Sequence, residues 1–143
     1  MAEFTYNPIQ LITAGQSAIL NTTIPCNKGY VYHRNESGIV ILRGIVNNPT
    51  NCYARYKVTF NGNIAVPEDG TPGEISVALS IDGEPLLTSN AIVTPTAADA
   101  YFNVTSTAFI TVPKGCCFSV SVENTSTISI NMQNANLVVE RVA

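Results

Sequence analysis

The chain has 143 residues, of which only 12% are charged, and its formal net charge is −3. This length suits one domain with a single hydrophobic core. The weakly negative balance, without any run of lysine or arginine, argues against nucleic-acid binding, and the longest aliphatic run, residues 39–42, is far too short to span a membrane.

The apolar content is typical of strands. Val, Ile and Thr supply 43 residues and Leu only 7, and β-branched side chains suit a pleated, half-buried surface better than a helix. Nowhere do apolar residues recur at helical spacing over three turns. The sequence therefore predicts an all-β sandwich or jelly roll of about ten antiparallel strands, as one domain over residues 1–143.

Residues 1–37 form the less regular part of this predicted domain. Short pairing strands are expected at residues 8–12 and 18–20. Residues 30–33 are expected to form a hairpin with residues 39–42, because polar residues and Gly38 separate the two apolar segments.

Residues 38–142 form the jelly-roll body, in which turn residues separate short apolar segments. The clearest signal is Ile75 to Ile81, where large apolar residues alternate with small ones and Asp82-Gly83 supplies a two-residue hairpin turn. The predicted strands are 38–43, 53–60, 75–81, 85–93, 101–112, 117–123, 127–132 and 136–142.

Two strands of this body carry apolar residues on the face away from the core. The last one places Leu137 and Val139 on one face and Val138 and Val142 on the other, and a strand that is apolar on both faces needs cover on both sides. Either a loop or another subunit could supply it.

The strand over residues 101–112 shows the same feature. A core face is predicted for Phe102, Val104, Ala108, Ile110 and Val112, with two aromatic residues opposite it. Outward aromatic residues are candidate interface anchors. The predicted interface between subunits therefore consists of Tyr101, Phe109, Val138 and Val142.

The residues that catalysis needs are scarce. The only histidine, His33, is interpreted as a surface side chain, and no nucleophile–base arrangement is visible. Glu68 and Asp69 could touch a cation, but a hard-cation site needs more oxygen ligands, so a solvated turn is preferred. No catalytic residue, metal or cofactor is predicted, and the chain is expected not to be an enzyme.

The four cysteines show no metal-binding spacing. Cys26, Cys52 and the pair Cys116-Cys117 lack a C-x-x-C motif, and adjacent strand residues point to opposite faces. Residues 1–5 lack the pattern of a secretory signal, so a reducing compartment and buried free thiols are expected. A disulfide between Cys52 and either Cys116 or Cys117 is the alternative.

Three segments, taken in order, resemble the tumour-necrosis-factor-like superfamily. Residues 52–60 look like its Gly-x-Tyr-x-Phe strand, with Cys52 and Arg55 as departures, and residues 75–85 look like its Val-x-Leu-x-x-Asn-Gly hairpin. Residues 105–115 resemble the stretch before its Gly-Asp turn, although Cys116 replaces Asp. The pattern is most similar to globular heads of complement subcomponent q, C-terminal domains of bacterial collagen-like spore-surface glycoproteins, and phage-borne jelly-roll trimers.

This resemblance implies a jelly roll packed as a tight homotrimer. The collagen stalk of those relatives, with Gly at every third position, does not occur in this sequence. A structural or binding role on the exterior of a particle is expected, foremost at a virion surface as a bacteriophage capsid decoration protein or fibre head. The alternatives are a bacterial spore- or cell-surface protein and a carbohydrate- or receptor-binding module.

The expected partners follow from these roles. Besides copies of itself, the chain is expected to contact a capsid or other particle-surface protein, and a host-surface glycan or receptor is a further candidate. Loops near residues 61–74 and 93–100 are the predicted contact surface for such a ligand. Neither nucleic acid nor membrane insertion is expected.

Overall fold

The computed structural model describes residues 2–24, 31–33, 37–46 and 49–142. Within these residues twelve strands form two six-stranded sheets, and all pairings are antiparallel. The elements are β1 (Ala2–Tyr6), β2 (Gln10–Ile12), β3 (Thr22–Ile24), β4 (Val31–His33), β5 (Val40–Arg43), β6 (Tyr53–Ala65), β7 (Ile75–Ile81), β8 (Glu84–Pro85), the short 3-10 helix η1 (Leu87–Ser89), β9 (Ala91–Val93), β10 (Phe102–Pro113), β11 (Cys117–Asn124) and β12 (Ile130–Arg141).

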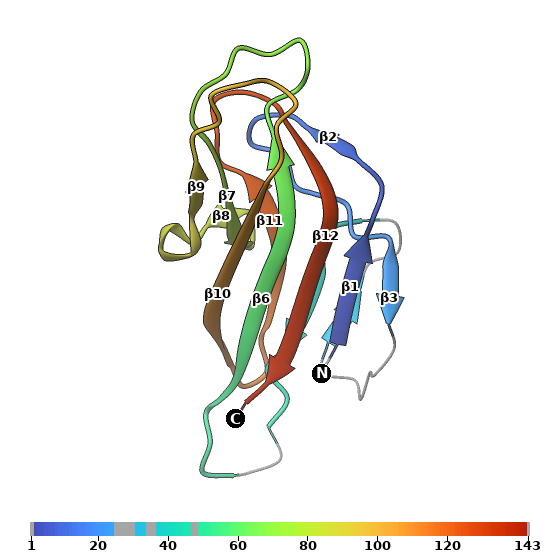
Figure 1. Cartoon of the computed structure of the whole chain (residues 1–143). Helices are drawn as coiled ribbons and strands as arrows, with labels where there is room; N and C mark the ends of the chain where they lie inside the picture. The colour runs from blue at the N-terminus through green and yellow to red at the C-terminus, as the bar shows by residue number, and fades with distance from the viewer. Residues whose placement is uncertain (1, 25–30, 34–36, 47–48, 143) are drawn as a thin grey trace.

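The two sheets are stacked as a sandwich (Figure 1). Sheet A has the order β10-β6-β12-β1-β3, with β2 also paired to β12. Sheet B has the order β4-β5-β11-β7-β8, with β9 also paired to β7. The predicted all-β jelly roll is confirmed, and the expected count of about ten strands becomes twelve because several short segments pair separately.

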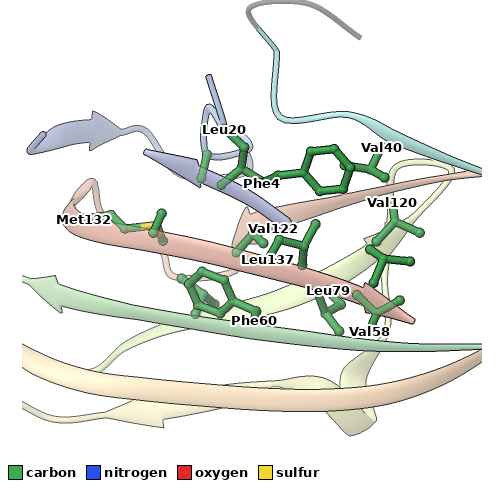
Figure 2. Packing of buried hydrophobic residues seen from close by; sticks show 14 of the residues in the cluster. Phe4, Leu20, Val40, Val58, Phe60, Leu79, Val120, Val122, Met132 and Leu137 are labelled. Carbon is green, nitrogen blue, oxygen red and sulfur yellow. The ribbon is translucent and has the colours of Figure 1, made fainter. Parts of the chain in front are cut away.

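The core fills the space between the sheets. Figure 2 shows Phe4, Val58, Phe60 and Leu137 of sheet A facing side chains of sheet B such as Leu79, with Leu20 closing one side. These side chains are all buried, so the hydrophobic cluster extends across the whole interior. Burial of this apolar surface is the main contribution to the stability of the domain.

The hairpin predicted after Ile81 is present. Asp82 and Gly83 have φ angles of 51° and 86°, as a two-residue turn with two left-handed positions requires. Ser80 pairs with Pro85 across it. The Asp82 carboxylate accepts hydrogen bonds from the backbone N–H and the hydroxyl of Ser119, at 2.8 and 3.0 Å, and so ties the turn to β11.

Two long strands differ from the predicted boundaries. β6 continues from Phe60 to Ala65 through Gly62, where an added Cβ would lie 2.9 Å from a ring atom of Phe60. The segments predicted at 127–132 and 136–142 form one strand, β12, whose pairing with β6 shifts register between Gln133 and Asn136. Gly and Asn indicated turns in both places, yet tertiary pairing kept the strands extended.

The strand predicted over residues 85–93 is wrong as a single element. It divides into β8, η1 and β9 because the Ser89 hydroxyl folds the chain back: it accepts from Leu79 N–H at 2.9 Å and donates to Leu86 O at 2.6 Å. Leu87 at the tip of this turn is 75% exposed. A side-chain hydrogen bond here replaces the ladder that the apolar run suggested.

The N-terminal strands were only partly predicted. The expected hairpin forms, with Tyr32 of β4 opposite Ile41 of β5, but residues 18–20 are not a strand. The largest omission is β1, which lies between β12 and β3 inside sheet A and buries Phe4 completely. Its apolar residues are few, so its position depends on the strands that flank it.

Candidate interaction surface

The strands β10, β6 and β12 are neighbours in sheet A (Figure 1), and their outward side chains form its outer face. Along β6 the buried and exposed positions alternate as predicted: Ala54 and Tyr56 point inward and are fully buried, while Tyr53, Arg55 and Lys57 point outward and are exposed. No element within the described residues covers these outward side chains.

Phe109 lies on this face near the end of β12, because Lys57, its partner on β6, also pairs with Glu140 of β12. Its side chain is 54% exposed, and it stands opposite Lys57 of β6. The Arg55 guanidinium carbon is 4.9 Å from the ring centroid, a cation–π contact on one side of the ring. An exposed, positioned aromatic ring of this kind is suited to contact a partner.

Val138 and Val142 lie on the same face. Val138 is half-buried on β12, directly between Thr59 of β6 and Glu3 of β1. Val142, just beyond β12, is 45% exposed, and its N–H donates to the Arg55 carbonyl at 2.8 Å. The structure thus brings Phe109, Val138 and Val142 to one surface, as their sequence pattern predicted.

Tyr101, the fourth residue of the predicted interface, lies just before β10 begins. Its hydroxyl oxygen is buried without a hydrogen-bond partner of good geometry among the described residues. Burial raises the pKa of this hydroxyl and the nearby Asp99 carboxylate raises it further, while the Asn131 side chain partly offsets the rise. The hydroxyl is therefore covered beside Asn131, which lies between the buried Ile130 and Met132 and so belongs to the outer side of β12.

Phe102 also differs from its prediction. It was expected on the core face, but it is 42% exposed. β10 pairs only with β6, so Phe102 lies at the first position of an edge strand where fewer side chains cover it. The core prediction is correct for Val104, Ile110 and Val112, which are buried.

The upper half of the same face carries a cluster of uncharged polar groups that sequence analysis missed. Asn103 donates from its amide nitrogen to Asn61 Oδ1 at 2.9 Å and to Asn63 Oδ1 at 3.2 Å. The Thr105 hydroxyl donates to Asn61 Oδ1 at 3.0 Å. We call these four residues the amide cluster; it was missed because Asn61 and Asn63 lie beyond the predicted end of their strand.

The remaining candidates do not combine into a reactive site. His33 is half-buried, with its ring centroid 5.0 Å from that of Phe4 and its Nε2 2.9 Å from Ser37 O, so it lies between the core and the surface. Glu68 and Asp69 border a hollow of about 540 Å³ together with Asn131. In the described ranges no three His, Cys, Asp or Glu side chains come close enough to hold a metal ion.

The cysteines are a further correction. Cys52, Cys116 and Cys117 are free, as expected, but they are exposed rather than buried. Cys52 immediately precedes β6 and Cys117 begins β11, so these side chains lie where the strands leave the sandwich. The disulfide considered for them does not form, and Cys26 lies outside the described residues.

Among the described residues, no helix has the length and apolarity that a membrane span requires.

Solved structures share this architecture. The domain is similar to a tumour necrosis factor, Eiger from S. frugiperda, with a TM-score of 0.70 and 12% identity over 100% of this chain and 92% of that one. It is also similar to the globular domain of zebrafish complement 1qA, with a TM-score of 0.60 and 12% identity over 96% and 94% of the two chains. Murine APRIL gives a TM-score of 0.54 and 11% identity over 93% and 98%.

Comparison by sequence matched no family model and no curated protein. The structural matches define the fold class: the chain has a jelly-roll fold similar to that of these tumour-necrosis-factor and complement-1q domains. The resemblance read from three sequence segments is thereby confirmed at the level of the fold. Identities of 11–12% carry the fold only.

Proposed function

We propose that this domain is a non-enzymatic structural protein that self-associates as a homotrimer through the outer face of sheet A. The particle on which it is displayed is a bacteriophage virion, where it serves as a capsid decoration protein or fibre head. The observation that supports self-association is the uncovered group of Phe109, Val138 and Val142 on a sheet whose opposite face is already buried in the core.

The composition of this face favours a second copy as its occupant. Its charged residues are of both signs and lie close together, with Lys57 directly opposite Glu140 across β6 and β12. A face with apolar residues, paired charges and neutral amides is compatible with an identical chain, whereas a surface of one sign would require an oppositely charged partner. A trimer is also the assembly that the family resemblance implies.

The experiment is sedimentation of the full chain and of Val138→Lys. We expect the wild type to have three times the chain mass of 15.3 kDa, and the variant to sediment as a single chain, because it places a charge on an apolar residue of the proposed interface. Ile19→Lys is the matched control, since it adds the same charge at an apolar residue that is 44% exposed on the other side of the sandwich.

A wild type that remains monomeric at high concentration would contradict the proposal, as would a trimer that Val138→Lys leaves intact. The virion assignment needs its own measurement. Antibodies against the chain should label phage particles released by lysis of the producing cells; labelling of spores or of intact cell surfaces instead would support the alternative bacterial role.

A further inference from the structure

A trough lies on the outer face of sheet B, where the neighbour of β11 changes. β5 pairs with β11 only as far as Val120. Beyond it the segment around Ser17 takes over: Ser17 bridges to Glu123, and Ala18 N–H donates to Val122 O at 2.8 Å. The change of neighbour leaves an open hollow of about 570 Å³, a volume in the range of small-molecule sites.

Three glycines border the trough and keep it open. Gly38 allows close packing against the Ser17 segment, because a Cβ there would lie 1.7 Å from Ala18 O. Gly15 and Gly83 have φ angles of 78° and 86°, which are typical of left-handed turns. Both have open space around them. A ligand can therefore approach the chain at Gly15 and Gly83 without meeting a side chain.

The polar lining consists mainly of hydroxyl groups. The Ser17 hydroxyl donates to the Ser121 hydroxyl at 3.2 Å, and Ser119 donates to Asp82. Each hydroxyl retains capacity to accept a further hydrogen bond. Glu123 is the one charged side chain among the described residues that line the trough, and its carboxylate receives only a long contact, 3.5 Å, from the Ser80 hydroxyl.

We propose that this trough binds a saccharide, with a neutral hexopyranose unit as the recognised group. The Glu123 carboxylate can accept hydrogen bonds from two adjacent sugar hydroxyls, and such charge-assisted bonds are stronger than neutral ones. Ser17 and Ser121 can exchange further hydrogen bonds with the ring hydroxyls, while Ile19, 44% exposed, offers an apolar edge to the C–H face of the sugar. An anionic ligand would be repelled by the carboxylate.

This site is separate from the surface proposed for self-association. The trough lies on sheet B, and the face that carries Phe109 and Val138 lies on sheet A, across the core. A trimer formed through sheet A would therefore leave each trough exposed. Loss of saccharide binding and loss of self-association can be measured independently, so either proposal can fail alone.

The test is titration of the isotopically labelled full chain with glucose, galactose, mannose and N-acetylglucosamine, followed by amide chemical shifts. We expect at least one sugar to shift the amides of Ser17, Ser121 and Glu123 together. Glu123→Gln should weaken that binding by about tenfold or more, because it removes the charge from the hydrogen-bond acceptor. Glu140→Gln, on the outer face of sheet A, should leave the affinity unchanged.

Ser17→Ala provides a second variant that should also weaken binding, and circular dichroism verifies that each variant is folded. The proposal is overturned if none of the four sugars shifts these amides, or if Glu123→Gln binds as tightly as the wild type. It is also overturned if ethylammonium shifts the same amides while the sugars do not, since the trough would then be a site for cations.

Discussion

The two faces of sheet A use one backbone in different ways. On β6 the inward residues Tyr56 and Phe60 are no more than 1% exposed, whereas the outward Tyr53 is 47% exposed. Sheet B covers the inward face, and no described element covers the outward one. The difference teaches that the fold is stabilised by one face of the sheet, which leaves the other free to be selected for contacts with a partner.

The largest expected effect contrasts two phenylalanines on these faces. Phe60→Ala should lower the free energy of unfolding by about 3–5 kcal/mol, because it removes a buried ring and leaves a cavity. Phe109→Ala should lower it by less than about 1 kcal/mol in the solitary chain, since it loses mainly the contact with Arg55. Urea unfolding followed by circular dichroism measures both, as the chain lacks tryptophan.

This pair must be measured at low protein concentration, because self-association adds a concentration-dependent contribution to apparent stability. Equal losses for the two variants would contradict the division between a stabilising face and a free face. A concentration dependence that Phe109→Ala abolishes would sharpen it, by assigning the outer ring to the interface.

A smaller effect is expected from two asparagines in matched roles. The Asn124 side chain is fully buried; its amide nitrogen donates to Ile12 O at 3.0 Å and to Ile128 O at 2.9 Å. Asn124→Ala should cost about 1–3 kcal/mol, because it leaves buried carbonyl groups unpaired. Asn103→Ala, in the exposed amide cluster, should cost less than about 1 kcal/mol, since water replaces its partners.

The same unfolding measurement distinguishes the two asparagines. A loss for Asn103→Ala as large as that for Asn124→Ala would mean that the amide cluster stabilises the chain itself. In that case the outer face of sheet A would also stabilise the fold and would not be available for partner contacts alone.

The smallest effect concerns Tyr101, whose hydroxyl oxygen is buried. Its pKa is raised mainly by burial, so the folded state retains the proton more strongly than the unfolded state does. The resulting stability is fully present below the ordinary tyrosine pKa of about 10 and is lost as the pH rises through the raised value. Tyr101→Phe should therefore reduce the loss of stability in alkali, measured by urea unfolding across that range.

Control for this effect comes from the phenolate absorbance of the folded wild type. Tyr101 should contribute a component that ionises later than in the unfolded chain, and that component should be missing from Tyr101→Phe. A variant with the same alkaline profile as the wild type would show that the hydroxyl is not buried.

Local pattern was sufficient to predict much of the fold. The strand over residues 75–81 and the Asp82-Gly83 hairpin have the predicted bounds and turn, because alternation and turn chemistry are properties of neighbouring residues. The outward positions of Phe109 and Val138 follow from the same alternation. These features needed no knowledge of distant segments.

Pattern failed where a distant contact decided the conformation. The predicted strand over 85–93 was interrupted by the hydroxyl of Ser89 bonded to Leu79, and β1 became an inner strand because β12 and β3 flank it. The amide cluster joins Asn61 to Asn103, which are 42 residues apart in the chain. Local sequence does not encode such pairings, because both strands must first be placed in the same sheet.

The sequence by itself determined the fold class and the inward or outward face of most residues within the predicted strands, since a period of two and the intervening turns are local. Only the tertiary structure decided which strands are neighbours and which surfaces they create. The trough depends on the bond between Ser17 and Ser121, 104 residues apart. The physical reason is that apolar burial forms the core as one unit, and the core then brings these two distant segments together.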